Sequence, residues 1–496
     1  MNHPLRNLAL AVLALLTASA PLAAEEMTLS HVVQEVLQQH PSLNISRTDT
    51  AIAAADEQRI EGLLDASLNG SIGGSDEKVP VSSDFQAAEN RNMQINGGIS
   101  QPLSNGGTVG LQASYSRSGQ GFTSPLASQL ARFNPAYRSQ IDVTYRHALL
   151  RGADRPDYSL GLESVQAKTA AASLDEHIVT RTLTLSAMNA FFRLASDDIN
   201  VTIARQAVER AREVLRYQKS RQEFGLIEQA EALQAEALLA ARRTDLQRAR
   251  AARQMDQNAL SRLMLGKLGQ DISLTLPPLS TSASIPDMDE AERLAVAQRP
   301  DIKAVDARLN AANADLAAAQ DIDSMQLDVV AQLGTRALDG KPATAAASGF
   351  SANDRFASLS LEMQDSVGRN SAKAAIRKAE LTRQRLNDQR QQALELIRDD
   401  LSTAITSIET GIPNLRLSRL QAMAEQKKYN AELKRYREGR SNTATLVQFE
   451  GELRNAQLQA RLQQLSLQLA HYQLAWSQGG LLKKLGIKLQ NGSEQP

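Results

Sequence analysis

The sequence carries one pattern of residues twice, and this duplication constrains the fold more than any other feature. The segment YQKSRQEFGLIEQAEALQAE at 217–236 matches AELKRYREGRSNTATLVQFE at 431–450, which aligns Gly225 with Gly439 at an offset of 214. Near the start of each copy, Pro41 aligns with Pro300 at an offset of 259. The first copy therefore contains about 45 residues that the second lacks. We predict two structural repeats, 25–275 and 276–480, and a C-terminal tail at 481–496.

The N-terminus and the composition indicate an exported protein. An apolar run from Leu8 to Leu16 follows Arg6 and precedes small residues that end at Ala24, which is typical of a secretory signal peptide at 1–24. The chain has no cysteine, so it forms no disulfide and lacks the acylated cysteine of a lipoprotein. Its formal net charge is zero and its basic residues are interspersed with acidic ones, which excludes a nucleic-acid footprint.

Each copy is predicted to contain a long helical hairpin. In the first copy, a stretch without proline predicts a helix over 157–224, a turn at Gly225 and a returning helix to about residue 265. In the second copy, the corresponding helices cover about 370–438 and end near residue 476, with the turn at Gly439. Pro413 aligns with Ile199 at the offset of 214, so we expect both ascending helices to break at this level.

The last helix carries two apolar stripes at helical spacing. The first stripe contains Leu446, Phe449, Leu453, Ala456, Ala460, Leu467, Ala470 and Leu474, and the second contains Leu458, Leu462, Leu465, Leu469, Tyr472 and Trp476. A two-stranded coiled coil needs one stripe, whereas a helix with neighbours on both flanks needs two. A closed ring of helices and an ordinary helical bundle both satisfy this requirement.

Outside the helices, apolar and polar residues alternate, as is typical of strands. The alternating segments lie at 66–73, 140–146, 326–329 and 357–363. Strands with one apolar and one polar face fit the wall of a transmembrane β-barrel, with lipid outside and water inside. A soluble antiparallel sheet has the same alternation, but the signal peptide and the aromatic residues in 66–148 and 325–368 favour the membrane.

The additional residues of the first copy are placed at about 92–136 and predict another hairpin. Alternating segments at 93–99 and 109–115 flank a turn at Asn105, Gly106 and Gly107. This hairpin fits either a part of the barrel wall or an appendage to it. Since one chain has too few strands to close a barrel with a useful bore, we expect several copies to share one barrel.

This layout, with RYREGRSNTATLVQFEGELRNAQ at 435–457 and YRHALLRG at 145–152, resembles the TolC-type outer-membrane efflux proteins. The resemblance covers essentially the whole chain after residue 24. It implies an α+β membrane protein, a homotrimer whose strands form one β-barrel in the lipid of the outer membrane and whose helices continue as a long periplasmic α-helical barrel. It also implies a passive exit duct of a tripartite efflux or type I secretion system. The partners would be a periplasmic adaptor (membrane fusion) protein and an inner-membrane pump of the RND or ABC class.

The resemblance assigns roles to residues at the two helix turns. The residues expected to form the adaptor-docking tip are Phe224, Gly225, Leu226, Ile227, Gly439, Arg440, Ser441, Asn442 and Thr443. The gate candidates are Glu231, Tyr436, Arg440, Thr445 and Gln448. The family often has acidic residues where this chain has Thr445 and Gln448, and a network of Glu231, Tyr436 and Arg440 is expected to hold the helices closed.

No residue pattern predicts an enzyme, a cofactor or a metal site. The six histidines have no metal-ligand spacing, and nothing resembles a phosphate loop or a nucleophile elbow. The alternative function is a periplasmic coiled-coil scaffold or adaptor protein, which predicts a β-rich module between helical arms rather than duplicated strand pairs. Within the duct hypothesis, drug efflux and protein secretion both remain open.

Overall fold

The computed structural model describes residues 25–224, 229–266, 272–279, 285–351 and 354–487, so the predicted signal peptide lies outside the described residues. The chain divides into two compact units. Unit 1 contains Met1–Arg47, Leu174–Ile302 and Gln391–Pro496, and unit 2 contains Thr48–Ser173 and Lys303–Arg390. Each unit takes segments from both predicted repeats, because the chain passes between the units within four helices.

The order of elements is repeated along the chain. The first copy contains β1 (Glu25–Thr28), α2 (Leu29–Gln39), α3 (Pro41–Glu61), the short 3-10 helix η1 (Gly62–Leu64), β2 (Ser67–Lys78), β3 (Ala87–Pro102), β4 (Gly107–Phe122), α4 (Pro125–Leu130), β5 (Ala136–Ala148), α5 (Pro156–Glu223) and α6 (Gln229–Leu263). There follow β6 (Ile272–Thr275), α7 (Met288–Gln298), α8 (Pro300–Ile322), β7 (Gln326–Asp339), α9 (Pro342–Ser348), β8 (Arg355–Gln364), α10 (Asn370–Arg437), α11 (Thr443–Ser477) and α12 (Leu481–Lys484). Helices, strands and a long helical hairpin follow one another in this order in both copies.

The two ascending helices, α5 and α10, are each 68 residues long and continuous. The predicted breaks at Ile199 and Pro413 are therefore wrong. Proline removes one backbone hydrogen bond from a helix, but packing on either side of it can hold the helix together. Ile408 and Leu415 are buried in one cluster with Leu467 of α11, which fixes α10 on both sides of Pro413.

A glycine ends α10 where the sequence predicts a turn. At the end of α10, Gly439 has φ +74° and its N–H donates to Tyr436 O at 3.0 Å, while Arg440 N–H donates to Arg435 O at 2.8 Å. This pair of bonds is the Schellman motif, which satisfies the last carbonyls of a helix. Asn442 then caps α11, because its Oδ1 accepts from Thr445 N at 2.8 Å.

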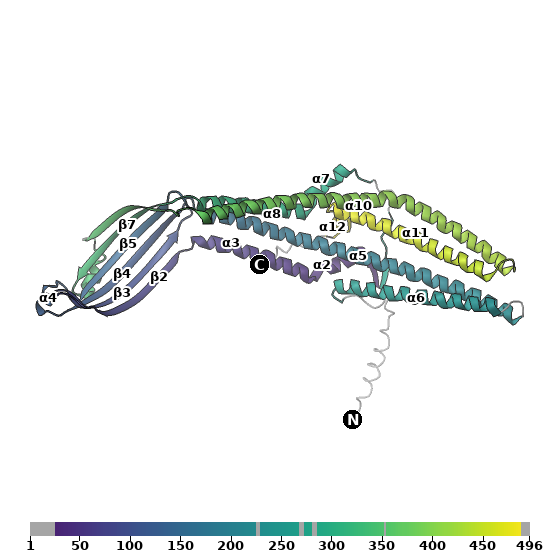
Figure 1. The fold of residues 1–496 in the computed structure, drawn as a ribbon, viewed down its shortest axis with the longest axis horizontal. Helices are drawn as coiled ribbons and strands as arrows, with labels where there is room; N and C mark the ends of the chain where they lie inside the picture. The colour runs from purple at the N-terminus through teal and green to yellow at the C-terminus, as the bar shows by residue number, and fades with distance from the viewer. Residues whose placement is uncertain (1–24, 225–228, 267–271, 280–284, 352–353, 488–496) are drawn as a thin grey trace, which may run out of the picture. The chain divides into compact units, whose positions relative to one another are not determined.

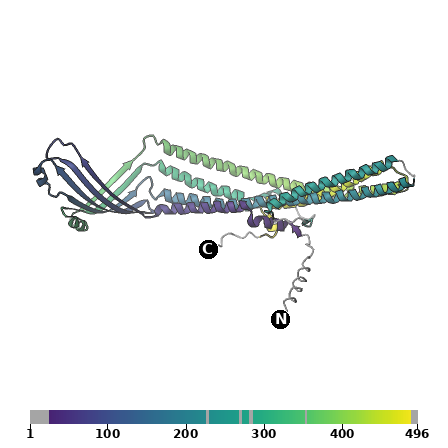
Figure 2. The ribbon, with the colours of Figure 1, turned by 90° about the horizontal axis from the view of Figure 1, so that it is seen from below.

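The described part of unit 2 contains one antiparallel sheet of six strands in the order β2-β3-β4-β5-β7-β8, and the strands lie side by side in both views (Figures 1 and 2). The hairpin predicted at 92–136 consists of β3 and β4, which are central in this sheet. It turns as predicted, with Gly106 at φ +79° and Gly107 N donating to Asn105 Oδ1 at 3.1 Å.

The register of the sheet separates an apolar face from a polar one. On one face, a single row across all six strands is apolar, and it consists of Leu68, Ile99, Leu111, Val143, Leu333 and Ala357. On the other face, the neighbouring row contains Asn69, Gly98, Gln112, Asp142, Gly334 and Phe356. The alternation predicted from single strands thus extends across the whole sheet.

Unit 1 is held together by helix packing and by a small sheet that the sequence analysis missed. β1 and β6 pair in parallel. They cover a core that includes Val32 and Val33 of α2, Phe191 of α5 and Leu465 of α11. The first apolar stripe of α11 is buried except for Phe449, which is partly buried, and the C-terminal half of the second stripe packs on this core. The predicted tail begins with α12, whose Leu481 is buried in the same core.

Candidate functional site

Four helices share a small core next to the two helix turns. Its buried residues are Val214 of α5, Ala235 of α6, Tyr429 and Tyr436 of α10, and Leu446 and Leu453 of α11. The Tyr436 side chain is almost fully buried, and its ring lies 5.5 Å from that of Tyr217 on α5. Burial raises the pKa of Tyr436, so its hydroxyl stays protonated at neutral pH.

A buried glutamine joins the gate candidates. Gln218 of α5 is completely buried, and its Nε2 donates to Thr443 Oγ1 at 2.6 Å and to Glu231 Oε2 at 3.2 Å. The Tyr436 hydroxyl lies 3.2 Å from Thr443 Oγ1. The structure therefore brings Tyr436 and Glu231 together through Gln218 and Thr443, and these bonds cross-link α5, α6, α10 and α11. No sequence pattern distinguishes Gln218 from the other polar residues of α5, so its role is visible only in the structure.

Arg440 does not join this network. Its guanidinium forms an ion pair with Glu438 and its side chain is 67% exposed. Ser441 donates to Glu432, and Tyr217 donates to Arg437 O at 2.9 Å, which satisfies a carbonyl in the last turn of α10.

The other predicted tip residues differ in exposure. Phe224 is 75% exposed, and Gly439 and Asn442 are exposed as well, whereas Thr443 is buried within the Gln218 network. Gly225, Leu226 and Ile227 lie outside the described residues. The side chain of Thr445 is engaged by the cap residue Asn442, and exposed Gln448 donates to Glu452 Oε1 at 2.9 Å.

A buried carboxylate on α11, seven residues after Thr443, joins three helices. Glu450 of α11 has a side chain that is 3% exposed. Its Oε1 accepts from Arg210 Nη2 of α5 at 3.0 Å, and its Oε2 accepts from Arg242 Nη2 of α6 at 2.8 Å. Arg242 also pairs with Asp245, which accepts from Arg454 Nη1 at 2.7 Å. This network fixes α5, α6 and α11 relative to one another by directional, charge-assisted bonds.

The single tryptophan marks a second charged network in unit 1. The Arg181 guanidinium lies 4.0 Å from the Trp476 ring centroid, and Trp476 Nε1 donates to Arg181 O at 3.1 Å. Arg299 pairs with Asp301 at 2.6 Å and with Asp400 at 2.9 Å. Burial and the neighbouring Arg299 lower the pKa of Arg181 to about 10, so the guanidinium remains charged at neutral pH.

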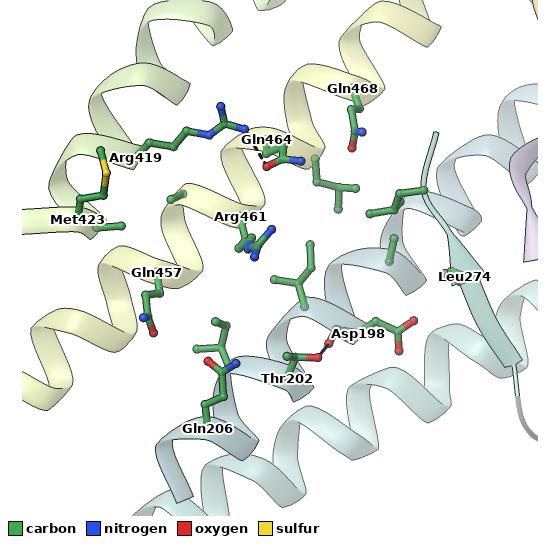
Figure 3. A pocket seen from close by; sticks show the side chains of 17 residues that line it. Asp198, Thr202, Gln206, Leu274, Arg419, Met423, Gln457, Arg461, Gln464 and Gln468 are labelled. Atoms are coloured by element: carbon green, nitrogen blue, oxygen red, sulfur yellow. Dashed lines mark hydrogen bonds between the residues drawn. The ribbon is translucent and has the colours of Figure 1, made fainter. Parts of the chain in front are cut away.

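A cavity of about 720 Å³ lies in unit 1, lined by α5, α10, α11 and the segment around β6 (Figure 3). Arg419 and Gln464 bond to each other at its wall, at 3.0 Å. Asp198 also lines it and accepts from Arg253 Nε at 2.5 Å. No sequence pattern predicts this cavity, because its lining comes from segments far apart in the chain.

Next to this cavity, burial and the nearby Asp256 raise the pKa of Asp197 from 3.8 to about 6. The folded-state value is the higher one, so ionisation of this carboxyl opposes folding, and this effect develops as the pH rises from about 4 to about 6.

The six-stranded sheet offers two chemically distinct surfaces. Its apolar face carries large exposed side chains, including Leu68 at 86%, Leu333 at 63% and Leu359 at 77%. Its polar face carries a hydrogen-bonded network, in which Gln332 Nε2 donates to Asp142 Oδ2 at 2.8 Å and Arg146 pairs with both Asp328 and Glu362 at 2.8 Å. A contiguous apolar surface of this extent marks contact with a membrane or a partner.

Tyrosines lie near both ends of the apolar face. Tyr115 and Tyr137 have ring centroids 6.3 Å apart near the loop end of the sheet. Tyr145 lies on the same face near the helix end, with its ring 6.0 Å from that of His147. Eight residues separate Tyr137 from Tyr145, which is roughly 26 Å of strand. At the strand tilt of about 35–45° found in outer-membrane barrels, this length corresponds to a height of roughly 20 Å, close to their apolar band of about 25 Å.

Within the described ranges, no group of three or more His, Cys, Asp or Glu side chains is arranged to hold a metal ion. None of the helices in the described part of the chain has an apolar stretch of the length that crosses a bilayer.

Comparisons with known proteins identify the fold. No protein-family model matches the chain, and no curated protein matches it. Among solved structures, the outer-membrane channel OprN aligns with a TM-score of 0.68 at 18% identity, over 91% of this chain and 90% of that chain. The CmeC outer membrane channel of Campylobacter jejuni aligns at 0.65 and 14% identity, over 91% and 86%. The outer membrane protein VceC of Vibrio cholerae aligns at 0.64 and 17% identity, over 91% and 96%. The chain therefore has the fold of these outer-membrane proteins over nearly its whole length.

Proposed function

We propose that this protein is a TolC-type outer-membrane channel, which serves as the passive exit duct of a tripartite efflux or type I secretion system. The observation that carries this proposal is the apolar row that continues across all six strands, from Leu68 to Ala357, with a polar row beside it on the opposite face. The apolar face of such a sheet is suited to contact with lipid, and its polar face to contact with water.

In this proposal, three copies place their sheets in one barrel in the outer membrane, and their long helices form a tunnel in the periplasm. The residues near Gly439 form the periplasmic end, where an adaptor protein docks. The exposed aromatic ring of Phe224 supports this role, because solvent-exposed aromatics are common anchors of protein interfaces. The hydrogen bonds of the Gln218 network hold α5, α6, α10 and α11 together at this end. An inner-membrane pump supplies the energy and direction of transport, because the duct itself performs no chemistry.

Fractionation and conductance test this function together. The full-length protein should be extracted from cell envelopes by detergent but not by carbonate, run as a heat-modifiable trimer, and produce discrete conductance steps in planar bilayers. A carbonate-extractable monomer without conductance would contradict the proposal, and would favour the periplasmic scaffold or adaptor instead.

A pair of adjacent substitutions on β4 distinguishes the lipid face from the water face. Leu111→Arg places a charge in the apolar row and is expected to cost roughly 2–4 kcal/mol per chain, because lipid cannot solvate a guanidinium. Gln112→Arg is the matched control, since Gln112 lies on the polar face beside Asp142. We expect Leu111→Arg to lower the urea concentration at which trimers dissociate in lipid vesicles, and Gln112→Arg to leave it unchanged. Equal effects of the two substitutions would argue against a membrane-facing row.

A further inference from the structure

The six-stranded sheet has two open edges. Among the described residues, β2 pairs only with β3 and β8 only with β7, so the outer edge of each strand is unpaired. All residues of β2 are exposed, and nine of the ten in β8 are exposed as well. Unpaired N–H and C=O groups along a strand are a ready template for another strand, and inside a bilayer they must be paired.

The two edges have complementary directions. The sheet is antiparallel throughout and contains an even number of strands, so its first strand β2 and its last strand β8 run in opposite directions. Strand β8 of one copy can therefore pair with β2 of the next copy and preserve the antiparallel order. Their apolar residues also match, because Leu68 and Ile72 on β2 lie on the same face as Leu359 and Leu361 on β8.

The outermost hairpin of the sheet, β2 and β3, presents the same apolar face as the other strands. Strands β2 and β3 are paired over twelve residue pairs, from Ser67 with Ser100 to Lys78 with Glu89. Their apolar residues Leu68, Ile72, Ile95 and Ile99 continue the face that β5, β7 and β8 present. A soluble appendage would gain nothing from an exposed apolar face in register with the membrane-facing one.

We infer that three copies of this chain close a barrel of eighteen strands, six from each subunit, by pairing β8 of one subunit with β2 of the next. This inference rests on the proposed function, and it specifies the number of strands in the barrel and the pair of strands that joins neighbouring subunits. Pairing the helix-proximal ends of the two strands, Ser67 with Gln364, sets the register. It places Ser71 opposite Ser360 on the polar face and Ile72 opposite Leu359 on the apolar face.

This register gives a barrel with ordinary geometry. Along the apolar row, Leu68 is the second residue from the helix end of β2, whereas Ala357 is the eighth from the helix end of β8. The row therefore climbs six residues over six strands, which corresponds to a strand tilt of roughly 35°. Closed barrels have tilts of about 35–45°. With eighteen strands at this tilt, the backbone radius is roughly 17 Å, against roughly 11 Å for twelve strands.

Disulfide cross-linking in the full-length, cysteine-free chain tests the joint. Ser71→Cys with Ser360→Cys should give covalent dimers and trimers on mild oxidation in isolated outer membranes, and no larger species. The two positions lie on opposite edges of one sheet, so any bond between them joins two subunits. Ser71→Cys with Leu359→Cys is the control, since Leu359 is the sequence neighbour of Ser360 but faces the opposite side of the sheet. We expect at least tenfold less cross-linked product from the control pair.

A third pair separates failure of this inference from failure of the proposed function. If β2 and β3 lay outside the wall, β4 would be its edge strand, and Ser114→Cys would cross-link to Ser358→Cys of the next subunit. That product, without a Ser71–Ser360 product, would overturn the eighteen-stranded barrel but leave a smaller trimeric duct. Absence of both products in a heat-modifiable trimer would also overturn the inference, whereas a water-soluble monomer would overturn the proposed function itself.

Discussion

Replacing Glu450 by glutamine is expected to destabilise unit 1 by about 3 kcal/mol, because removal of one member of a buried ion pair leaves the other charges uncompensated. Glu450 accepts hydrogen bonds from Arg210 and Arg242, and the three side chains are 3%, 17% and 12% exposed. Glutamine keeps the size of the side chain but offers only one acceptor oxygen, so one of the two guanidinium groups loses its bond to residue 450. The urea midpoint of the detergent-solubilised protein, followed by the fluorescence of Trp476, measures the loss.

The duplication provides a matched control for this substitution. Glu236 aligns with Glu450 in the first copy, but it pairs with Lys219 near the surface, and the two side chains are 46% and 53% exposed. Exposed pairs of this kind contribute about 0–1 kcal/mol. Glu236→Gln should therefore leave the urea midpoint almost unchanged. If both substitutions shift the midpoint equally, the Glu450 network does not stabilise the helices in the way that its burial indicates.

The long helices were predictable because few residue types can interrupt a helix. Prolines and glycines are nearly absent from 157–224 and 370–438, and the structure places α5 and α10 within one residue of these bounds. The predicted break at Pro413 is wrong for a physical reason. Proline propensity is local, whereas the packing of Ile408 and Leu415 against α11 depends on which helices are neighbours in space. The sheet followed from alternation alone, but its strand order, and hence the central place of β3 and β4, depends on pairings between segments far apart in sequence.

The candidate site was predictable only in part, for a similar reason. The duplicated sequence identified Gly439 as a turn position, and Tyr436 was expected to hold the helices closed. No sequence pattern indicates that Gln218 lies between Glu231 and Thr443, since these residues come from α5, α6 and α11. The expected role of Arg440 placed it with Tyr436 and Glu231, yet Glu438, two residues away, provides a nearer partner. Local partners of this kind compete with long-range ones, and the sequence alone does not rank them.

Replacing Tyr436 by alanine is expected to be the most damaging change near the turns. The ring is almost completely buried against Tyr217 and Leu446, so its removal leaves a cavity and should cost about 3–5 kcal/mol. The lost packing is shared by α5, α10 and α11, which are the helices that the Gln218 network holds together. If these helices close the duct, the Tyr436→Ala channel should open more often and to higher conductance in planar bilayers than the unmodified channel.

Tyr436→Phe separates the ring from its hydroxyl. The phenyl ring preserves the packing with Tyr217, and only the contact between the hydroxyl and Thr443 Oγ1 is lost, which should cost about 1 kcal/mol. Thr443 still receives the bond from Gln218, so the network remains connected. We therefore expect Tyr436→Phe to conduct nearly as the unmodified protein does. A Tyr436→Ala channel with unaltered conductance but a lowered urea midpoint would show that this core stabilises the helices without closing the duct. A Tyr436→Phe channel as open as Tyr436→Ala would instead assign the closure to the hydroxyl and its bond with Thr443.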